Sequence, residues 1–500
     1  CSSDLLNVNG HEKTGMATPY IQERCINLAK RGLLALNPEW LGRGQLLEEK
    51  GLDHYRMNQL DLCGTSGLGV FHLAVRRALD VALGLPNADP ERVAVTGLSG
   101  GGWQTIFLGA LDERVKLANP VAGYSSYVTR VQFPSLDLGD SEQTPSDLAT
   151  VVDYTHLTAL MAPRPTLLTY NAKDNCCFRA DYALAPLVQA ASPVFRLLGA
   201  ADRLRQHVNH DAGHNYGRDN REALYRFLRD HRFTATADFP LAEIPSEAEV
   251  RTADELRVPL LPGNQDFNSL ARRIAAGLPL PGKPDRARLC AVVHAPEYVV
   301  VPTEAGSGSA WNAEVRRWRL RMGLDWTLPA VELTPPGARS TIVFVADAGR
   351  AAAAPRVREL LAAGHRVVAV DPFYFGESKI AGQPGLFAIL VAALGERPLG
   401  IQAGQVAAVA RWLADGRGLG PVGLVTEGPQ TGLIGLVAAA LEVDAISGLE
   451  QRGAMASLRE VIEGDVTVMQ RPEQFCFGLL REFDVPQIGA LVSPRPLVAR

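Results

Sequence analysis

The chain lacks a surplus of charge of either sign. Its 500 residues include 50 lysines and arginines against 54 aspartates and glutamates, which gives a formal net charge of −4. Nucleic acids and anionic membrane surfaces are bound through concentrations of basic residues, and this balance does not supply one. We therefore expect a small or neutral partner and no nucleic acid.

Long hydrophobic runs and cysteine-rich patterns are missing as well. The longest apolar stretches, residues 385–395 and 431–441, reach about half of the roughly 20 residues that a helix needs to cross a bilayer, so we expect no membrane span. The seven cysteines are an odd number in a long chain, which does not make a disulfide framework. No spacing of cysteines and histidines resembles that of a zinc site, and we expect no bound metal.

The apolar sequence that is present is enough for two hydrophobic cores. Hydrophobic residues make up 47% of the chain and charged residues 21%, values typical of globular proteins. A chain of 500 residues is too long to fold around one ordinary hydrophobic core. Strand-like and helical patterns alternate in both halves, which predicts mostly parallel sheets flanked by helices. We expect two tandem α/β domains at residues 1–236 and 311–500, joined by a linker and irregular segment at 237–310.

The two halves also share local sequence. ALMAPRP at 159–165 aligns without gaps on ALVSPRP at 490–496. Asp153 and Asp484 each stand ten residues before the first proline of these segments. Duplication explains such matches better than chance, although unrelated α/β domains share the strand and helix rhythm.

Ser99 lies in GLSGGGW, residues 97–103, after an apolar strand-like run and before an apolar helical run. Gly-x-Ser-x-Gly in this setting is the pattern of a nucleophile elbow, a turn too tight for side chains at Gly97 and Gly101. In a chain with 47 glycines the bare motif can arise by chance, so a glycine-rich turn is the alternative. The flanking strand and helix favour Ser99 as a nucleophile.

A nucleophilic serine needs a histidine base and a carboxylate that orients the histidine. In this arrangement the chain order is serine, acid, histidine. The next convincing buried strand after Ser99 covers residues 165–170, and Asp174 in the loop that follows it is the expected acid. Asp202 is the alternative, but its arginine neighbours are typical of an exposed, ion-paired face.

The expected base lies in HVNHDAGHNYG, residues 207–217. His214 is preferred because it stands in a polar turn after a glycine. His207 and His210 are the alternatives, at positions where a strand and its exit are expected.

The oxyanion hole requires two backbone N–H groups aimed at the developing negative charge. Gly100, directly after the nucleophile, is expected to supply one. The other is expected from the loop Asn9-Gly10-His11-Glu12, with His11 or Glu12 as the donor. Trp103 and Tyr124 are candidate substrate-binding residues, with packing in the core as the alternative.

Six motifs together, NGHEKTG, NPEWLGRG, GLSGGGW, MAPRP, KDNCC and GHNYG, resemble the α/β-hydrolase superfamily in its acetyl xylan esterase and dienelactone-hydrolase-like branch. The resemblance covers residues 1 to about 235. Together with the duplication, it leads us to expect two tandem α/β-hydrolase domains. The resemblance implies a serine esterase for carbohydrate or small carboxylic esters, with Ser99, Asp174 and His214 at the triad positions. It implies no metal and no organic cofactor. The Asn-Gly-His loop departs from the His-Gly of many relatives.

The second half resembles a copy that has lost its site. Aligning the elbows places residues 426–430 over GLSGG, so Gly428 stands at the nucleophile position and Pro429 removes a backbone N–H. When the two Pro-Arg-Pro segments are aligned, Arg500 corresponds to Thr169, which stands five residues before Asp174. We expect this domain to pack against, shape or cover the first; a glycan-binding role lacks an aromatic platform in the sequence.

Two other functions are compatible with the same sequence features. A serine peptidase or amidase has the same triad, and a non-catalytic binding or scaffold protein is compatible with the degenerate second half. The expected substrate is a small-molecule or carbohydrate ester. The acyl group, the alcohol portion and the oligomeric state stay open, as does the compartment, for which a secreted or periplasmic location is preferred.

Overall fold

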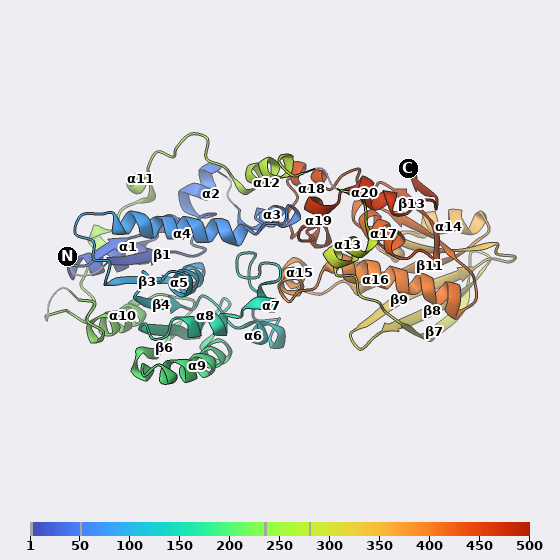
Figure 1. Ribbon diagram of the computed structural model, residues 1–500. Coiled ribbons are helices and arrows are strands. Elements are labelled where there is room, and N and C mark those ends of the chain that lie inside the picture. The colour runs from blue at the N-terminus through green and yellow to red at the C-terminus, as the bar shows by residue number, and fades with distance from the viewer. Residues whose placement is uncertain (1–3, 51–52, 235–237, 280–281) are drawn as a thin grey trace. The chain divides into compact units, whose positions relative to one another are not determined.

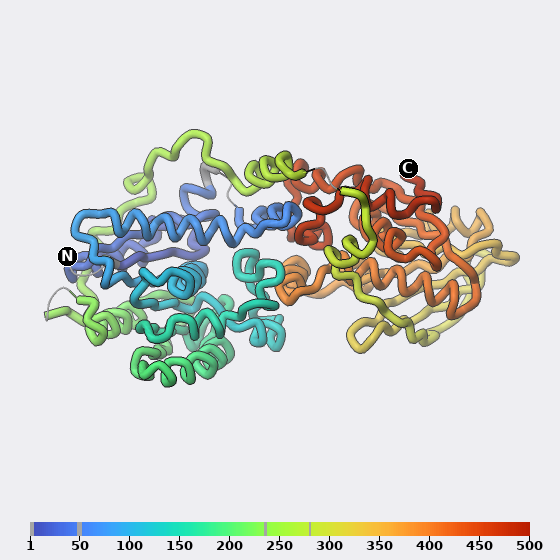
Figure 2. The backbone as a smooth tube through the Cα atoms, viewed as in Figure 1, coloured from blue at the N-terminus to red at the C-terminus, as the bar shows by residue number. Residues whose placement is uncertain are grey.

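The computed structural model describes residues 4–50, 53–234, 238–279 and 282–500, which form two compact units. Unit 1 is Cys1–Met57 with Ser66–Phe267, and unit 2 is Asn58–Thr65 with Asn268–Arg500. Figure 1 shows the elements of each unit, and Figure 2 follows the path of the backbone through them. The expected domain boundary at 236 and 237 lies outside the described residues.

Unit 1 is built on a six-stranded sheet in which all neighbouring strands are parallel, in the order β2-β1-β3-β4-β5-β6. The central strand β3 is buried along its whole length and mostly apolar, as expected of a strand covered on both faces. The carboxyl ends of all six strands therefore share one edge of the sheet. The strands are β1 (Asp4–Val8), β2 (Leu34–Leu36), β3 (Val93–Leu98), β4 (Leu117–Val121), β5 (Thr166–Lys173) and β6 (Leu204–Ala212).

Helices cover both faces of this sheet (Figure 1). On one face, Leu28 of α1 and Leu224 of α10 share a core with Leu117 of β4. The next residue of that strand, Ala118, faces α5 at Gly109 on the other side. The helical segments are η1 (Gly15–Ala17), α1 (Pro19–Lys30), α2 (Gly44–Lys50), η2 (His54–Arg56), α4 (Gly67–Leu83), α5 (Gly100–Leu111), α6 (Tyr127–Gln132), α7 (Leu148–Val151), α8 (Tyr154–Leu160), α9 (Ala180–Leu197), η3 (Ala201–Arg203), α10 (Arg218–Asp230), η4 (Glu247–Glu249) and α11 (Ala253–Leu256).

Unit 2 contains an eight-stranded sheet in the order β14-β13-β12-β10-β11-β9-β8-β7. The first five strands of this order are parallel, and β9, β8 and β7 continue the sheet as an antiparallel meander. The expected fold class, two α/β domains with mostly parallel sheets flanked by helices, is confirmed. The strands are β7 (Val300–Ala310), β8 (Ala313–Met322), β9 (Trp326–Thr334), β10 (Ser340–Ala346), β11 (His365–Val370), β12 (Val422–Glu427), β13 (Ile446–Arg452) and β14 (Leu497–Ala499).

In unit 2, as in unit 1, helices connect successive parallel strands along the chain. Strand β12 leads into α17 as β3 leads into α5. The helical segments are α3 (Gln59–Leu62), α12 (Phe267–Ala276), which begins at the unit boundary, α13 (Arg286–Val293), η5 (Arg350–Ala352), α14 (Ala354–Ala362), η6 (Gly376–Ser378), α15 (Pro384–Ala393), α16 (Pro398–Arg411), η7 (Trp412–Gly416), α17 (Pro429–Leu441), α18 (Arg459–Glu463), η8 (Pro472–Gln474), α19 (Leu479–Glu482) and α20 (Val485–Ala490).

The parallel parts of the two sheets have the same strand order. The order β2-β1-β3-β4-β5 in unit 1 matches β11-β10-β12-β13-β14 in unit 2. In each unit the arginine of the shared Pro-Arg-Pro sequence, Arg164 or Arg495, donates to the carbonyl that ends the helix after the elbow, Asp112 or Glu442.

Residues 238–279 and 282–310 include regular elements where we expected a linker and irregular segment. They contain α12, α13 and strand β7, which pairs with β8 along its whole length. Strand β7 is exposed at the sheet edge and rich in Gly and Ser, so it lacks the alternation of apolar and polar residues that signals a strand.

Among the described residues, no single helix is long and apolar enough to cross a membrane. The pair Pro384–Ala393 and Pro398–Gly416 reaches the required length only together, and it is bent by 93°. Residues 398–410 of this pair are buried in unit 2.

Candidate functional site

Ser99 occupies a strained turn between β3 and α5. Its backbone has φ 60° and ψ −124°, a conformation that non-glycine residues rarely adopt. An added Cβ at Gly97 or at Gly101 would lie 2.3 Å from the carbonyl oxygen of Val8, so only glycine fits on either side of the serine. The backbone N–H of Ser99 donates to Val121 at 3.0 Å, which holds the turn to the end of β4. Strain of this kind is concentrated at functional sites.

Asp174 and His214 meet at the same edge of the sheet. Asp174 follows β5 and His214 follows β6, and the backbone N–H of Gly213 donates to Lys173 at 3.0 Å, which joins the two strand ends. The Nδ1 of His214 lies 2.7 Å from Oδ2 of Asp174, whose side chain is fully buried. This is the orientation that a carboxylate gives to a general-base histidine.

The electrostatics of this pair are those of a histidine stabilised by a carboxylate. Burial lowers the pKa of His214, but the hydrogen bond and the charge of Asp174 outweigh burial, and the pKa is raised above its ordinary value. Burial raises the pKa of Asp174, but the hydrogen bond and the charge of His214, together with hydrogen bonds from Cys176 and Asn171, outweigh burial, so the net shift is downward. The carboxylate is therefore ionised at neutral pH and favours the imidazolium that base catalysis forms.

The alternative acid and bases lie elsewhere. Asp202 precedes β6 and is exposed at the opposite edge of the sheet, so it cannot reach His214. His207 lies within β6 and pairs with Asp219 at 2.7 Å. His210 is exposed.

Ser99 and His214 make no hydrogen bond with each other in this structure. The Nε2 of His214 is buried and has no hydrogen-bond partner among the described residues. Side chains of catalytic pairs are often misaligned without substrate and come together when substrate binds. The structure therefore pairs Asp174 with His214, and it places Ser99 on the same edge of the sheet.

The loop after β1 closes over the elbow. An added Cβ at Gly10 would lie 2.7 Å from the backbone nitrogen of Gly100 and 3.0 Å from Cβ of Ser99. The backbone N–H of Glu12 already donates to Gly10 at 2.8 Å, whereas that of His11 has no hydrogen bond among the described residues. His11 is therefore better placed than Glu12 to donate to an oxyanion with Gly100.

Trp103 and Tyr124 lie in the core of unit 1. Trp103 is 1% exposed and donates to the hydroxyl of Tyr154, and Tyr124 is fully buried with its hydroxyl 3.1 Å from that of Thr158. These are the contacts of packing residues. The sequence analysis did not single out Trp40. An added Cβ at Gly100 would lie 2.6 Å from its ring, which places Trp40 next to the nucleophile candidate.

A group of metal-ligand type also escaped the sequence analysis. Ligand atoms of His11, His54 and Glu142 lie within 4.8 Å of one another in unit 1. Separations of 43 and 88 residues give no local spacing by which such a group could be recognised.

The elbow of unit 2 has a different chemistry. Gly428 stands between β12 and α17 at φ 110°, and an added Cβ there would lie 2.3 Å from Cγ of Asp347. The carboxylate of Asp347 accepts hydrogen bonds from the backbone N–H groups of Gln430 and Thr431 at 3.1 and 2.7 Å. A fixed carboxylate thus occupies the helix N-terminus at this elbow.

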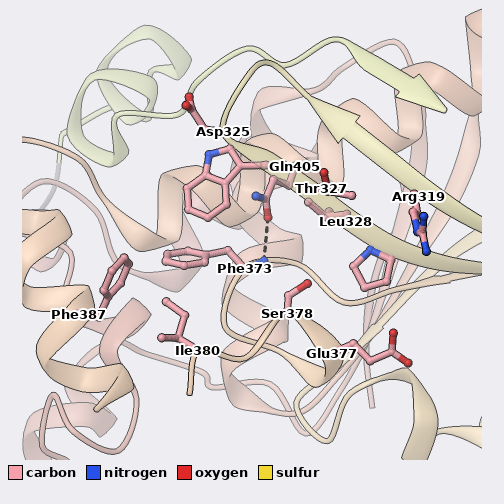
Figure 3. Close-up of a pocket in the computed structure, with 12 residues that line it drawn as sticks. Arg319, Asp325, Thr327, Leu328, Phe373, Glu377, Ser378, Ile380, Phe387 and Gln405 are labelled. Atoms are coloured by element: carbon pink, nitrogen blue, oxygen red, sulfur yellow. Dashed lines mark hydrogen bonds between the residues drawn. The ribbon is translucent and has the colours of Figure 1, made fainter. Parts of the chain in front are cut away.

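Unit 2 also contains an open pocket beside β9 (Figure 3). Phe373 and Phe387 line it, and the ring of Trp326 lies 4.6 Å from that of Phe373. Its twelve lining residues include no histidine, and the Ser378 hydroxyl donates to the backbone of Asp371, so no serine and base pair is present there. These aromatic residues form a wall that the sequence did not reveal, because they come from separate segments.

One family model and several solved structures are similar to parts of this chain. The acetyl xylan esterase family model matches residues 69–151, which include the elbow. A solved methylesterase is 20% identical with a TM-score of 0.43, and the match covers 55% of this chain and 58% of that one. Acetyl xylan esterase 1 from Thermoanaerobacterium sp. is 17% identical with a TM-score of 0.34, over 45% of this chain and 74% of that one.

An acylaminoacyl peptidase from Pyrococcus horikoshii is 16% identical with a TM-score of 0.34, over 48% of this chain and 39% of that one. Comparison with curated proteins gave no match. The family match over residues 69–151 confirms the resemblance of this chain to the acetyl xylan esterase-like branch of the α/β-hydrolases.

Proposed function

We propose that this protein is a serine esterase that hydrolyses carboxylic esters through an acyl-enzyme, with acetyl esters of carbohydrates as the first substrates to test. The observation that carries the proposal is the pairing of His214 with the buried Asp174 at the sheet edge where the strained turn presents Ser99. The match of the elbow segment to the acetyl xylan esterase family supports the acetyl group as the acyl portion.

In the proposed mechanism, Oγ of Ser99 attacks the ester carbonyl carbon and its proton passes to Nε2 of His214. The ionised Asp174 stabilises the imidazolium that results. The negative charge on the carbonyl oxygen is stabilised by the N–H groups of Gly100 and His11, and one such donor contributes about 3 kcal/mol in other hydrolases. The alcohol leaves with the proton from His214, and water then cleaves the acyl-enzyme by the same steps.

We further propose that unit 2 is a degenerate copy of unit 1 with no esterase site of its own. The common strand order and the equivalent roles of Arg164 and Arg495 support the duplication. Asp347 supports the loss of activity, because its carboxylate would repel an oxyanion from the helix N-terminus.

A fluorophosphonate probe tests the nucleophile on the full chain. We expect one site of labelling, lost in Ser99→Ala and reduced at least a hundredfold in rate in His214→Ala. His207→Ala is the matched control, since His207 is also paired with an aspartate at 2.7 Å but lies outside the site. Labelling that persists in Ser99→Ala, or is absent from the wild type, contradicts the proposal.

Substrate class is tested by hydrolysis of acetylated xylan, p-nitrophenyl acetate and feruloyl esters alongside peptide amides. We expect turnover of acetyl esters that depends on Ser99. Turnover of amides in preference to esters would support the peptidase or amidase alternative instead.

A further inference from the structure

Side chains from three separate segments of unit 1 converge on one point. His11 follows β1, His54 belongs to η2, and Glu142 lies between α6 and α7. Nε2 of His11 is 3.3 Å from Nδ1 of His54 and 3.3 Å from Oε1 of Glu142. The other carboxylate oxygen of Glu142, Oε2, is 2.8 Å from Nδ1 of His54. Oδ2 of Asp140 lies 3.6 Å from Nε2 of His11.

Hydrogen bonds alone do not satisfy this cluster. Two ring nitrogens that face each other can share at most one proton. Glu142 is fully buried, and its Oε1 accepts no hydrogen bond of good geometry among the described residues, its ion-pair partner being Nε2 of His11 at 3.3 Å. A buried carboxylate oxygen without a hydrogen bond is costly unless a cation compensates for the lost water.

We propose that these residues bind one divalent transition-metal ion, and that Zn²⁺ is the ion that they match best. Zinc bonds of 2.0–2.2 Å in tetrahedral geometry place neighbouring ligand atoms about 3.3 Å apart, close to the separations observed here. Two imidazoles with Glu142 and Asp140 form a nitrogen and oxygen donor set that zinc accepts. The two carboxylate charges balance the charge of the ion.

The cluster has a closed side and an open side. The side chains of His54 and Glu142 are 5% and 0% exposed, whereas those of His11 and Asp140 are 22% and 25% exposed. An ion can therefore enter past the partly exposed His11 and Asp140 and be bound by the buried His54 and Glu142. The hydroxyl of Tyr55 donates to Oδ1 of Asp140 at 3.1 Å, which orients this carboxylate with Oδ2 toward the cluster.

The ion is positioned to fix the loop that covers the elbow. His11 directly follows Gly10, which lies against the backbone of Gly100, and the His11 ring meets Trp40 edge to face at 4.6 Å. Binding would tie this loop to the segments that carry His54 and Glu142. None of the ligands is Ser99, Asp174 or His214, so the metal site does not depend on the proposed esterase function.

Metal content of the purified full chain tests the proposal. After treatment with a chelator and dialysis against Zn²⁺, we expect one Zn²⁺ per chain, and Co²⁺ in its place should give the visible absorption of a tetrahedral site. Glu142→Gln and His11→Ala should each bind Zn²⁺ more than about 100-fold more weakly, since loss of an outer-shell partner alone costs up to that factor. Ser99→Ala and His207→Ala should keep a full equivalent.

Thermal unfolding provides a second measurement. Chelation should lower the Tm of the wild type and of Ser99→Ala, and it should leave the Tm of Glu142→Gln unchanged. His11→Ala changes a partly exposed side chain, which serves as the ligand variant if Glu142→Gln does not fold. Wild-type protein without bound Zn²⁺, full Zn²⁺ retention in both ligand variants, or preference for Ca²⁺ over Zn²⁺ would overturn the proposal.

Discussion

Replacing Gly10 by alanine should damage catalysis by moving one loop. The new Cβ would lie 2.7 Å from the backbone nitrogen of Gly100, 2.7 Å from the carbonyl oxygen of Leu98 and 3.0 Å from Cβ of Ser99. Favourable contacts between carbon atoms begin near 3.5 Å, so the loop must retreat by roughly 0.5–1 Å. All three contacts are with backbone or with the nucleophile itself, and none can be relieved by turning a flexible side chain.

Such a displacement is enough to break a hydrogen bond. A donor at about 2.9 Å from the oxyanion would move to roughly 3.5 Å or beyond, where little of the interaction remains. Loss of one oxyanion-hole donor lowers kcat by about 10²–10³, or about 3 to 4 kcal/mol, and we expect a decrease of this size in Gly10→Ala. KM should change little, because the lost interaction forms in the transition state.

The assay is steady-state hydrolysis of p-nitrophenyl acetate together with thermal unfolding. Gly69→Ala is the matched control, because Gly69 lies on the exposed side of α4 with no atom within 4 Å of an added Cβ. That variant should keep the wild-type kcat and gain up to about 1 kcal/mol of stability from helix propensity. A Gly10→Ala enzyme that is folded and retains more than half of the wild-type kcat would refute the assignment of this loop to the oxyanion hole.

Three further predictions concern charges. Because Asp174 raises the pKa of His214, kcat/KM should rise with pH through an apparent pKa above the ordinary histidine value. Asp174→Asn should move this apparent pKa down and lower kcat by up to about 10⁴-fold, and a pH–rate profile of both enzymes measures the two effects. Asp347→Asn should weaken the cap of α17 by about 1 kcal/mol, measured as a lower Tm, while the esterase rate stays at the wild-type value. Burial raises the pKa of Glu473 from 4.5 to about 8, so the folded state holds a proton that the unfolded state releases, and stability falls as pH rises between these values. Glu473→Gln should therefore raise the Tm at pH 8 and have little effect at pH 4, and an equal effect at both would contradict this origin.

The pairing of Asp174 with His214 could be predicted because the position of each depends on local sequence and on chain order. Ser99 follows a buried strand within a glycine pattern that leaves one backbone path. Asp174 and His214 each follow a strand of a parallel sheet, so the order of strands brings them to one edge. The arginine neighbours of Asp202 already counted against it, and the structure adds that Asp202 precedes its strand rather than follows it.

Other features depend on contacts that no local pattern encodes. His54 and Glu142 are separated by 88 residues and are brought together by loops, whose paths the sequence does not determine. Strand β7 is defined by its pairing with β8 and not by its composition. Trp103 is of a residue type that often lines pockets, and only its burial in the folded chain shows that it belongs to the core.

The two elbows differ in which of two facing positions carries a side chain and which carries glycine. In unit 1 the pairing of Val8 with Gly97 places Gly10 level with Ser99, and in unit 2 the pairing of Ala346 with Glu427 places Asp347 level with Gly428. Each level has room for one side chain, as the contacts of an added Cβ at either glycine show. In unit 1 that side chain is the serine, and the glycine opposite leaves the helix N-terminus free for an oxyanion; in unit 2 it is the carboxylate, which already binds the helix N-terminus. Restoring a nucleophile by Gly428→Ser alone should therefore yield no second labelled serine, since Asp347 fills the space that its Cβ requires.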